Sequence, residues 1–214
     1  MLGIPLDELV ARIIVLITAF TIHELAHAWT AEWFGDDTPR ANGRLSLNPL
    51  VHLDPIGSLL LLVAGFGWAK PVPVNPYALG RRSSLALMWV SLAGPMSNFL
   101  MAVIAAIPMR IAITTPGALG LASQPFLFRL LGDFVYINLI LMLFNLIPIA
   151  PLDGSKIASA VLPEKWGQAV EQFSAYGPIV LLVLVFVGPM VGIDVLGWIM
   201  NPVMNNLMTL LIGV

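Results

Sequence analysis

Several apolar stretches of this chain are long enough to cross a lipid bilayer as helices. The first covers residues 9–33, and a spanning helix needs about 20 mainly apolar residues. Hydrophobic residues make up 58% of the 214-residue sequence and charged residues only 10%, whereas a soluble domain carries roughly 25% charged residues. The sequence therefore predicts an integral membrane protein.

The order of these stretches predicts the helices. We expect spans over residues 8–34, 84–109 and 127–149, with Ala93-Gly94-Pro95 interrupting the second. Residues 177–213 fit either one long broken helix or two short spans, and we favour two. The fold class is thus an all-α polytopic membrane protein, a bundle of about 4–6 transmembrane helices.

The stretch between the first two spans, residues 36–83, is mixed in character. Residues 44–47 and 71–76 alternate like short strands, and the prolines of the second segment suit a sheet edge. Residues 56–66 are apolar but too short to cross a bilayer, so they are interpreted as a re-entrant or interfacial segment. We therefore expect a small β-rich re-entrant region after the first helix.

Charge indicates the orientation and excludes some partners. The 36–83 stretch holds five Lys and Arg residues, whereas the 110–126 loop holds only Arg110. The excess of positive charge predicts that the 36–83 side is cytoplasmic. A net charge of −2 indicates no nucleic-acid partner, and the absence of cysteine excludes disulfides and Cys-ligated zinc.

The first apolar stretch contains a metal-binding pattern. His23, Glu24 and His27 form H-E-x-x-H, and residues four apart lie on the same face of a helix. Two imidazoles so placed can bind one Zn²⁺, and the glutamate between them can reach a water molecule on the metal. The alternative is hydrogen bonding to neighbouring helices, but a buried glutamate without a function is expensive. The motif lies about 12 Å from the helix end, hence inside the membrane near the cytoplasmic surface.

A catalytic zinc site needs a third protein ligand. The extended motif H-E-x-x-H-x-x-G-x-x-H fails here, because Thr30 and Trp33 replace its glycine and its third histidine. Glu32 is too close in sequence, and the next glutamate is Glu164. Among the aspartates, Asp153 is the best candidate because it follows a span end broken by prolines, although Pro-Leu-Asp-Gly is also ordinary turn chemistry.

Two motifs together resemble those of a known family. The sequences H-E-L-A-H at residues 23–27 and N-L-I-P-I-A-P-L-D-G at residues 145–154 are similar to the paired motifs of the site-2 proteases, which are intramembrane zinc metalloproteases. The sequences S-L-A-G-P-M-S-N at residues 91–98 and F-G-W-A-K-P-V-P-V-N at residues 66–75 are also family-like. The resemblance implies that His23, His27 and Asp153 bind one Zn²⁺ per chain and that Glu24 is the catalytic base.

The same resemblance implies how a substrate is handled. The expected activity is hydrolysis of peptide bonds within or near transmembrane segments of membrane-anchored proteins, in a prokaryotic cell membrane. Asn98 and Asn145 would stabilise the oxyanion or hold the substrate backbone, and both roles stay open. Residues 71–76 could offer an edge to an unwound substrate. For His52, loop ordering is favoured over metal binding.

We expect a minimal form of this family, without a PDZ-sized insert and with nothing before the motif helix. It would be one membrane-embedded domain over residues 1–214, with a catalytic core at about 8–155 and C-terminal helices at about 177–213. One alternative is a zinc-binding scaffold that does not cut, against which the intact Glu24 argues. The other is a metal transporter, which usually shows internal repeats that are not evident here.

Overall fold

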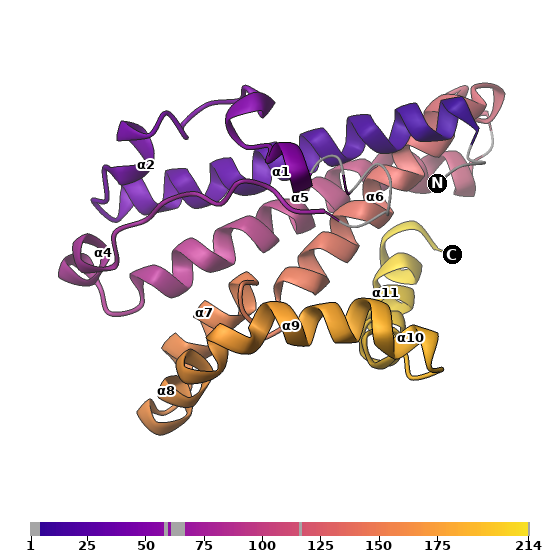
Figure 1. The fold of residues 1–214 in the computed structure, drawn as a ribbon. Coiled ribbons are helices and arrows are strands. Elements are labelled where there is room, and N and C mark those ends of the chain that lie inside the picture. Colours follow the sequence, from indigo (N-terminus) through magenta and orange to yellow (C-terminus); the bar gives the residue numbers. More distant parts are fainter. Residues whose placement is uncertain (1–4, 58–59, 61–66, 116, 214) are drawn as a thin grey trace.

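Long helices dominate the computed structural model, which describes residues 5–57, 60, 67–115 and 117–213 (Figure 1). In this part of the chain, five helices are long and apolar enough to cross a membrane, namely Leu6–Trp33 (α1), Ala86–Thr114 (α5), Pro125–Asn145 (α6), Glu164–Met190 and Val195–Ile212 (α11). The prediction of an integral, all-α membrane protein is confirmed.

Shorter elements join or subdivide these spans. The first two spans are connected through α2 (Thr38–Ala41), η1 (Pro49–Val51) and α4 (Pro76–Arg82), and η2 (Leu121–Ser123) precedes α6. After α6 comes α7 (Asp153–Val161). The fourth span comprises α8 (Glu164–Phe173), η3 (Ser174–Tyr176), α9 (Gly177–Leu182), the π-helical turn η4 (Val183–Val187) and α10 (Gly188–Met190).

The helices α1, α5 and α6 lie side by side and form the centre of the molecule (Figure 1). The buried face of α5 presents Ala102, Ala105 and Ala106 to a cluster that includes Val135 and Leu139 of α6. Small side chains let membrane helices approach closely, because dispersion contacts and hydrogen bonds rather than water exclusion hold such helices together. This close packing brings polar residues of α1 and α5 into contact.

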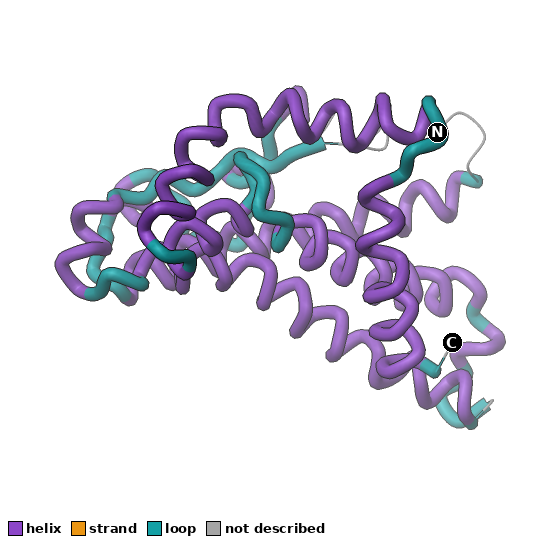
Figure 2. Tube along the Cα trace, turned by 90° about the horizontal axis from the view of Figure 1, so that it is seen from below, coloured by secondary structure: helices purple, strands orange, loops and turns teal. Residues whose placement is uncertain are grey.

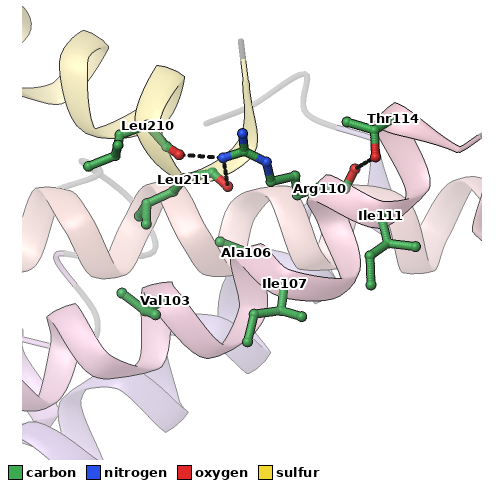
Figure 3. A pocket seen from close by; sticks show the side chains of 8 residues that line it. All are labelled: Val103, Ala106, Ile107, Arg110, Ile111, Thr114, Leu210 and Leu211. Carbon is green, nitrogen blue, oxygen red and sulfur yellow. Dashed lines mark hydrogen bonds between the residues drawn. The ribbon is translucent and has the colours of Figure 1, made fainter.

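The C-terminal helices form a second group beside this centre (Figure 1). The helix α11 packs on α5 and α6, and Arg110 of α5 fixes its end. Figure 3 shows the Arg110 side chain reaching the carbonyl oxygens of Leu210 and Leu211, at 2.5 and 3.4 Å from Nη1. The last carbonyls of a helix have no intrahelical partner, so a guanidinium there satisfies them and complements the helix dipole.

The expected β-rich region is wrong for the residues that the structure describes. Figure 2 shows helices and loops there but no strand, and the β-type pairing is one isolated bridge between Leu53 and Ala69. Residues 71–75 are in neither a helix nor a strand, and Pro76 begins α4. The prolines of this segment have no N–H to donate, and Val72 and Asn75 donate their N–H groups to carboxylates. Most of 56–66 lies outside the described residues, so its re-entrant character stays a prediction.

Two further expectations concern helix breaks. The predicted interruption at Ala93-Gly94-Pro95 is wrong, because α5 runs continuously through Pro95; tight packing against α1 and α6 offsets the lost hydrogen bond. The favoured division of 177–213 into two segments is confirmed. The chain turns between Met190 and Val195, Gly192 adopts a φ of +82°, and Asp194 caps α11 by accepting from the Gly197 N–H at 2.8 Å.

Candidate metal centre and active site

The two histidines of α1 point the same ring nitrogen at one place. The Nε2 atoms of His23 and His27 lie 3.0 Å apart, one helical turn from each other. Their other ring nitrogens are engaged by α5, since His27 Nδ1 donates to the Val90 carbonyl at 2.6 Å and His23 Nδ1 lies 2.6 Å from Asn98 Oδ1. A carbonyl oxygen can only accept, so Nδ1 carries the proton and both Nε2 lone pairs are free to bind a metal.

Asp153 completes a triangle of donor atoms. Its Oδ2 lies 3.1 Å from His27 Nε2 and 3.2 Å from His23 Nε2. Tetrahedral zinc with bonds of 2.0–2.1 Å needs ligand atoms about 3.3 Å apart. The three distances between the donor atoms match this value, and a tetrahedral site would have a fourth coordination position left for water or substrate. All three residues are buried. The donor set and its spacing therefore fit Zn²⁺.

Two glycines make this approach possible. A Cβ on Gly94 would lie 2.6 Å from His23 Nε2 and closer still to His27 Nε2, so a larger residue in α5 would occupy the place of the metal. A Cβ on Gly154 would collide with the carbonyl oxygens of Leu146 and Ile147. Gly154 thus lets the first turn of α7 sit against the end of α6, which places Asp153 beside α1.

The ionisation of Asp153 suits a metal ligand. Burial alone would raise the pKa of its carboxyl group, but attraction to His27 and hydrogen bonds from both imidazoles, when their Nε2 atoms carry protons that a bound metal would replace, outweigh it. The net effect holds the pKa of Asp153 below its usual range, so the carboxylate is ionised at neutral pH. Metal ligands must be deprotonated to bind, and Asp153 meets that condition.

Glu24 lies beside this triangle on α1 and is 8% exposed. Its Oε2 accepts a hydrogen bond from the Val72 N–H at 3.2 Å. Buried side chains hold the segment around Val72. Asp36, in the turn after α1, accepts from the Asn75 N–H at 2.6 Å, and Arg44 donates to the carbonyls of Lys70 and Pro71 at 3.1 and 3.3 Å.

A cleft of about 540 Å³ opens at the donor triangle, within the 300–1,000 Å³ usual for ligand sites. The triangle and Glu24 form part of its wall. Around them the lining is mainly apolar, contributed by the segment 67–74, by Phe144 at the end of α6 and by Leu181 and Phe186 of the fourth span. Lys156, half-exposed, also lines the cleft, with its Nζ 3.9 Å from Asp153 Oδ1.

The structure separates the two asparagines that were expected at the substrate. Asn98 is fully buried, and its Nδ2 donates to Asn138 Oδ1 at 2.9 Å while its Oδ1 faces His23. Asn98 thus lies behind the His23 imidazole, which favours a positioning role. Asn145 lines the cleft, and its Nδ2 donates to the Leu141 carbonyl at 3.0 Å. His52 is buried in the loop, where its Nε2 lies 2.7 Å from the Ser46 carbonyl oxygen.

Sequence reasoning missed three contributions to the site. The Val72 N–H at Glu24 is a backbone group and has no sequence signal. Asp36 and Arg44 are charged residues in a polar loop, which predicts exposure, yet both are buried. Asn138 is not among them, because an asparagine within an apolar span predicts interhelical hydrogen bonding, and its Oδ1 does accept from Asn98.

Comparison with known proteins agrees with this geometry. Residues 108–186 match the model of a family described as "Peptidase family M50". The Bacillus subtilis protein named "Putative zinc metalloprotease YwhC" is 44% identical over 186 residues, which cover 87% of this chain and 84% of that protein. A Mycolicibacterium smegmatis protein named "Putative zinc metalloprotease Rip2" is 28% identical over 190 residues, covering 84% and 69% respectively. No solved structure matches the chain.

Proposed function

The chain belongs to peptidase family M50, the site-2 proteases, with Zn²⁺ as cofactor, and on that premise we propose that it cuts peptide bonds within or near transmembrane segments of membrane-anchored proteins. The observation that carries the proposal is the triangle of His23, His27 and Asp153 beside Glu24. The triangle opens onto an apolar cleft within a bundle of spanning helices.

In this proposal His23, His27 and Asp153 hold the zinc ion. When bound, zinc supplies Lewis acidity, which polarises a scissile carbonyl and acidifies water. The Glu24 carboxylate accepts a proton from the attacking water molecule and then passes this proton to the leaving amine. The Val72 N–H holds Oε2 of that carboxylate in place, while the Val90 carbonyl and Asn98 hold the two imidazoles. The apolar lining excludes bulk water, which strengthens these interactions.

The cleft suits an apolar segment in an extended conformation. Its walls come from α1, α5 and the end of α6 on one side and from the fourth span on the other. A substrate helix has its amides bonded internally, so it must unwind before its carbonyls can reach the site. We further propose that this takes place at the cell membrane, near its cytoplasmic surface. In α1, six residues follow His27, about 9 Å of helix.

The test is cleavage by the purified protein in detergent, using synthetic apolar segments of about 20 residues flanked by polar ends. We expect the zinc-loaded wild type to cut some of these segments. In Glu24→Gln cleavage should fall about 10²–10⁴-fold with bound zinc unchanged, because the variant keeps the ligands and loses the base.

Soluble peptides with the polar ends alone serve as the matched control and should be cut poorly. If zinc is bound and the wild type and Glu24→Gln are equally inert on every segment, the scaffold alternative replaces the protease. Zinc flux into liposomes containing the wild type would instead support the transporter.

A further inference from the structure

Ser91 of α5 is a buried hydroxyl residue in the wall of the cleft. Its side chain is 1% exposed and lines the same cleft as the donor triangle and Glu24. Within the part of the chain that the structure describes, its Oγ has no hydrogen-bond partner. A buried polar atom without a partner is costly. Because Ser91 lines the cleft, a bound ligand could supply the missing partner.

Other helical hydroxyls in this protein behave differently. Thr18 and Thr21 donate to the carbonyl four residues earlier, at 2.8 and 2.7 Å, and Ser97 donates to the Gly94 carbonyl at 2.7 Å. Such bonding within the preceding turn is the default for serine and threonine in apolar helices. Ser91 departs from this default, and together with Leu87 and Val90 it forms the part of α5 that lines the cleft.

The carbonyl group of Ser91 also lacks its usual donor within the helix. Proline has no N–H, so Pro95 cannot donate to the Ser91 carbonyl four residues before it. Ser91 therefore has a hydroxyl and a carbonyl without their usual intrahelical partners. One donor and one acceptor on the same residue match the two polar groups of a peptide unit.

The position of Ser91 relative to the metal centre is defined by its neighbours. Val90, the residue before it, holds His27 Nδ1 through its carbonyl. Gly94, three residues later, faces the Nε2 atoms of both histidines. Ser91 therefore lies about one helical turn, roughly 5 Å along α5, from the donor triangle.

We propose that Ser91 is a substrate-binding residue, whose Oγ donates a hydrogen bond to a backbone carbonyl of the extended peptide in the cleft. An extended peptide advances about 3.3 Å per residue, so a distance of one helical turn places this carbonyl one or two residues from the scissile bond. A backbone contact is independent of the substrate's side chains, which suits a protease that acts on apolar segments of varied sequence. The proposal rests on the proposed function.

The test compares Ser91→Ala with Ser97→Ala, a matched change in the same helix whose hydroxyl bonds the Gly94 carbonyl. Using a segment that the wild type cuts, we expect Ser91→Ala to lower kcat/KM about tenfold, mainly through KM. Bound zinc and Tm should be unchanged, since the substitution removes a hydroxyl that has no structural partner. Ser97→Ala should leave kcat/KM within about twofold of the wild type.

A second readout does not depend on turnover. A peptide hydroxamate anchors at zinc and offers backbone carbonyls to the cleft, and its displacement can be followed in the Glu24→Gln background. Adding Ser91→Ala should weaken its binding about tenfold. Unchanged kcat/KM together with unchanged hydroxamate affinity would overturn the role of Ser91 while leaving the protease intact. A lowered Tm or loss of zinc would also overturn it and assign Ser91 a structural role.

Discussion

At the scale of single residues, the metal centre depends on the lack of a side chain at Gly94 as much as on the side chains that would bind the metal. A Cβ on Gly94 would overlap the space between His23 and His27. The sequence suggests close packing at Gly94, but only the structure shows that the neighbour is a pair of imidazoles. The spacing of His23 and His27, by contrast, predicts the site directly, because residues four apart lie about one turn from each other on the same face of a helix.

Gly94→Ala should therefore weaken zinc binding about 100-fold or more, as the imidazoles must turn away from the added methyl group. The measurement is bound zinc in competition with a chelator of known affinity. Gly80→Ala is the matched control, because a Cβ there meets nothing within 4 Å. Zinc retention at wild-type affinity in Gly94→Ala would mean that the ligands lie elsewhere.

Asn98 tests the distinction between holding a ligand and touching a substrate. Asn98→Ala should lower zinc affinity roughly 10–100-fold, because His23 loses the acceptor that fixes its tautomer and orientation. Chelator competition again provides the measurement. Asn145→Ala should keep wild-type zinc affinity, since that side chain bonds the Leu141 carbonyl and lines the cleft. If both variants bound zinc with equal affinity, Asn98 would not position His23, and stabilisation of the substrate oxyanion would be the favoured role.

At the scale of elements, the long helices were predictable and the loop between the first two was not. Spans follow from length and apolar composition, which the bilayer demands of any helix that crosses it. The alternating pattern of residues 71–76 predicts a strand. A chain segment can alternate its side chains without pairing with another strand, so this pattern alone does not establish a sheet. Whether such a segment belongs to a sheet depends on the partners of its backbone N–H groups. Here the N–H groups of Val72 and Asn75 donate to carboxylates of α1 and of the turn that follows it.

Asp36 is the residue on which this segment most depends. Asp36→Ala removes a buried carboxylate that accepts from the N–H groups of Thr38 and Asn75, at 3.0 and 2.6 Å, and should cost about 2–3 kcal/mol of stability. Thermal unfolding in detergent should show the loss, and cleavage should fall because Val72 is no longer held at Glu24. Asp37→Ala changes the exposed neighbour and should leave both unchanged. A Tm for Asp36→Ala equal to that of Asp37→Ala would refute this role.

At the scale of the whole molecule, one metal ion would connect helices that are distant in sequence. Two of the proposed ligands lie on α1, and the third begins α7. The sequence suggested this grouping because both motifs lie at the ends of expected spans, yet the depth of each ligand depends on glycine contacts that no pattern shows. The cleft likewise arises from how the C-terminal helices lie against α1, α5 and α6, which is tertiary packing.

Removal of zinc should therefore destabilise the entire bundle. Ligand binding to the folded state alone contributes about 4 kcal/mol at 1,000 times Kd, so chelation should lower Tm markedly. Glu24→Gln should show the same chelator-dependent shift, because Glu24 is not a ligand, and Asp153→Asn should show a much smaller one. If chelation leaves Tm unchanged in the wild type, zinc does not bridge α1 and α7.

The 126 positions that separate His27 from Asp153 also matter during synthesis of the protein. The ribosome completes and releases α1, with its H-E-x-x-H motif, long before it translates Asp153. While α5 and α6 enter the membrane as unpaired apolar segments, which are the kind of chain that this protein is proposed to cut, the catalytic triangle has only two of its three corners. The order of the proposed ligands along the gene thus leaves the site incomplete until α7 has been made.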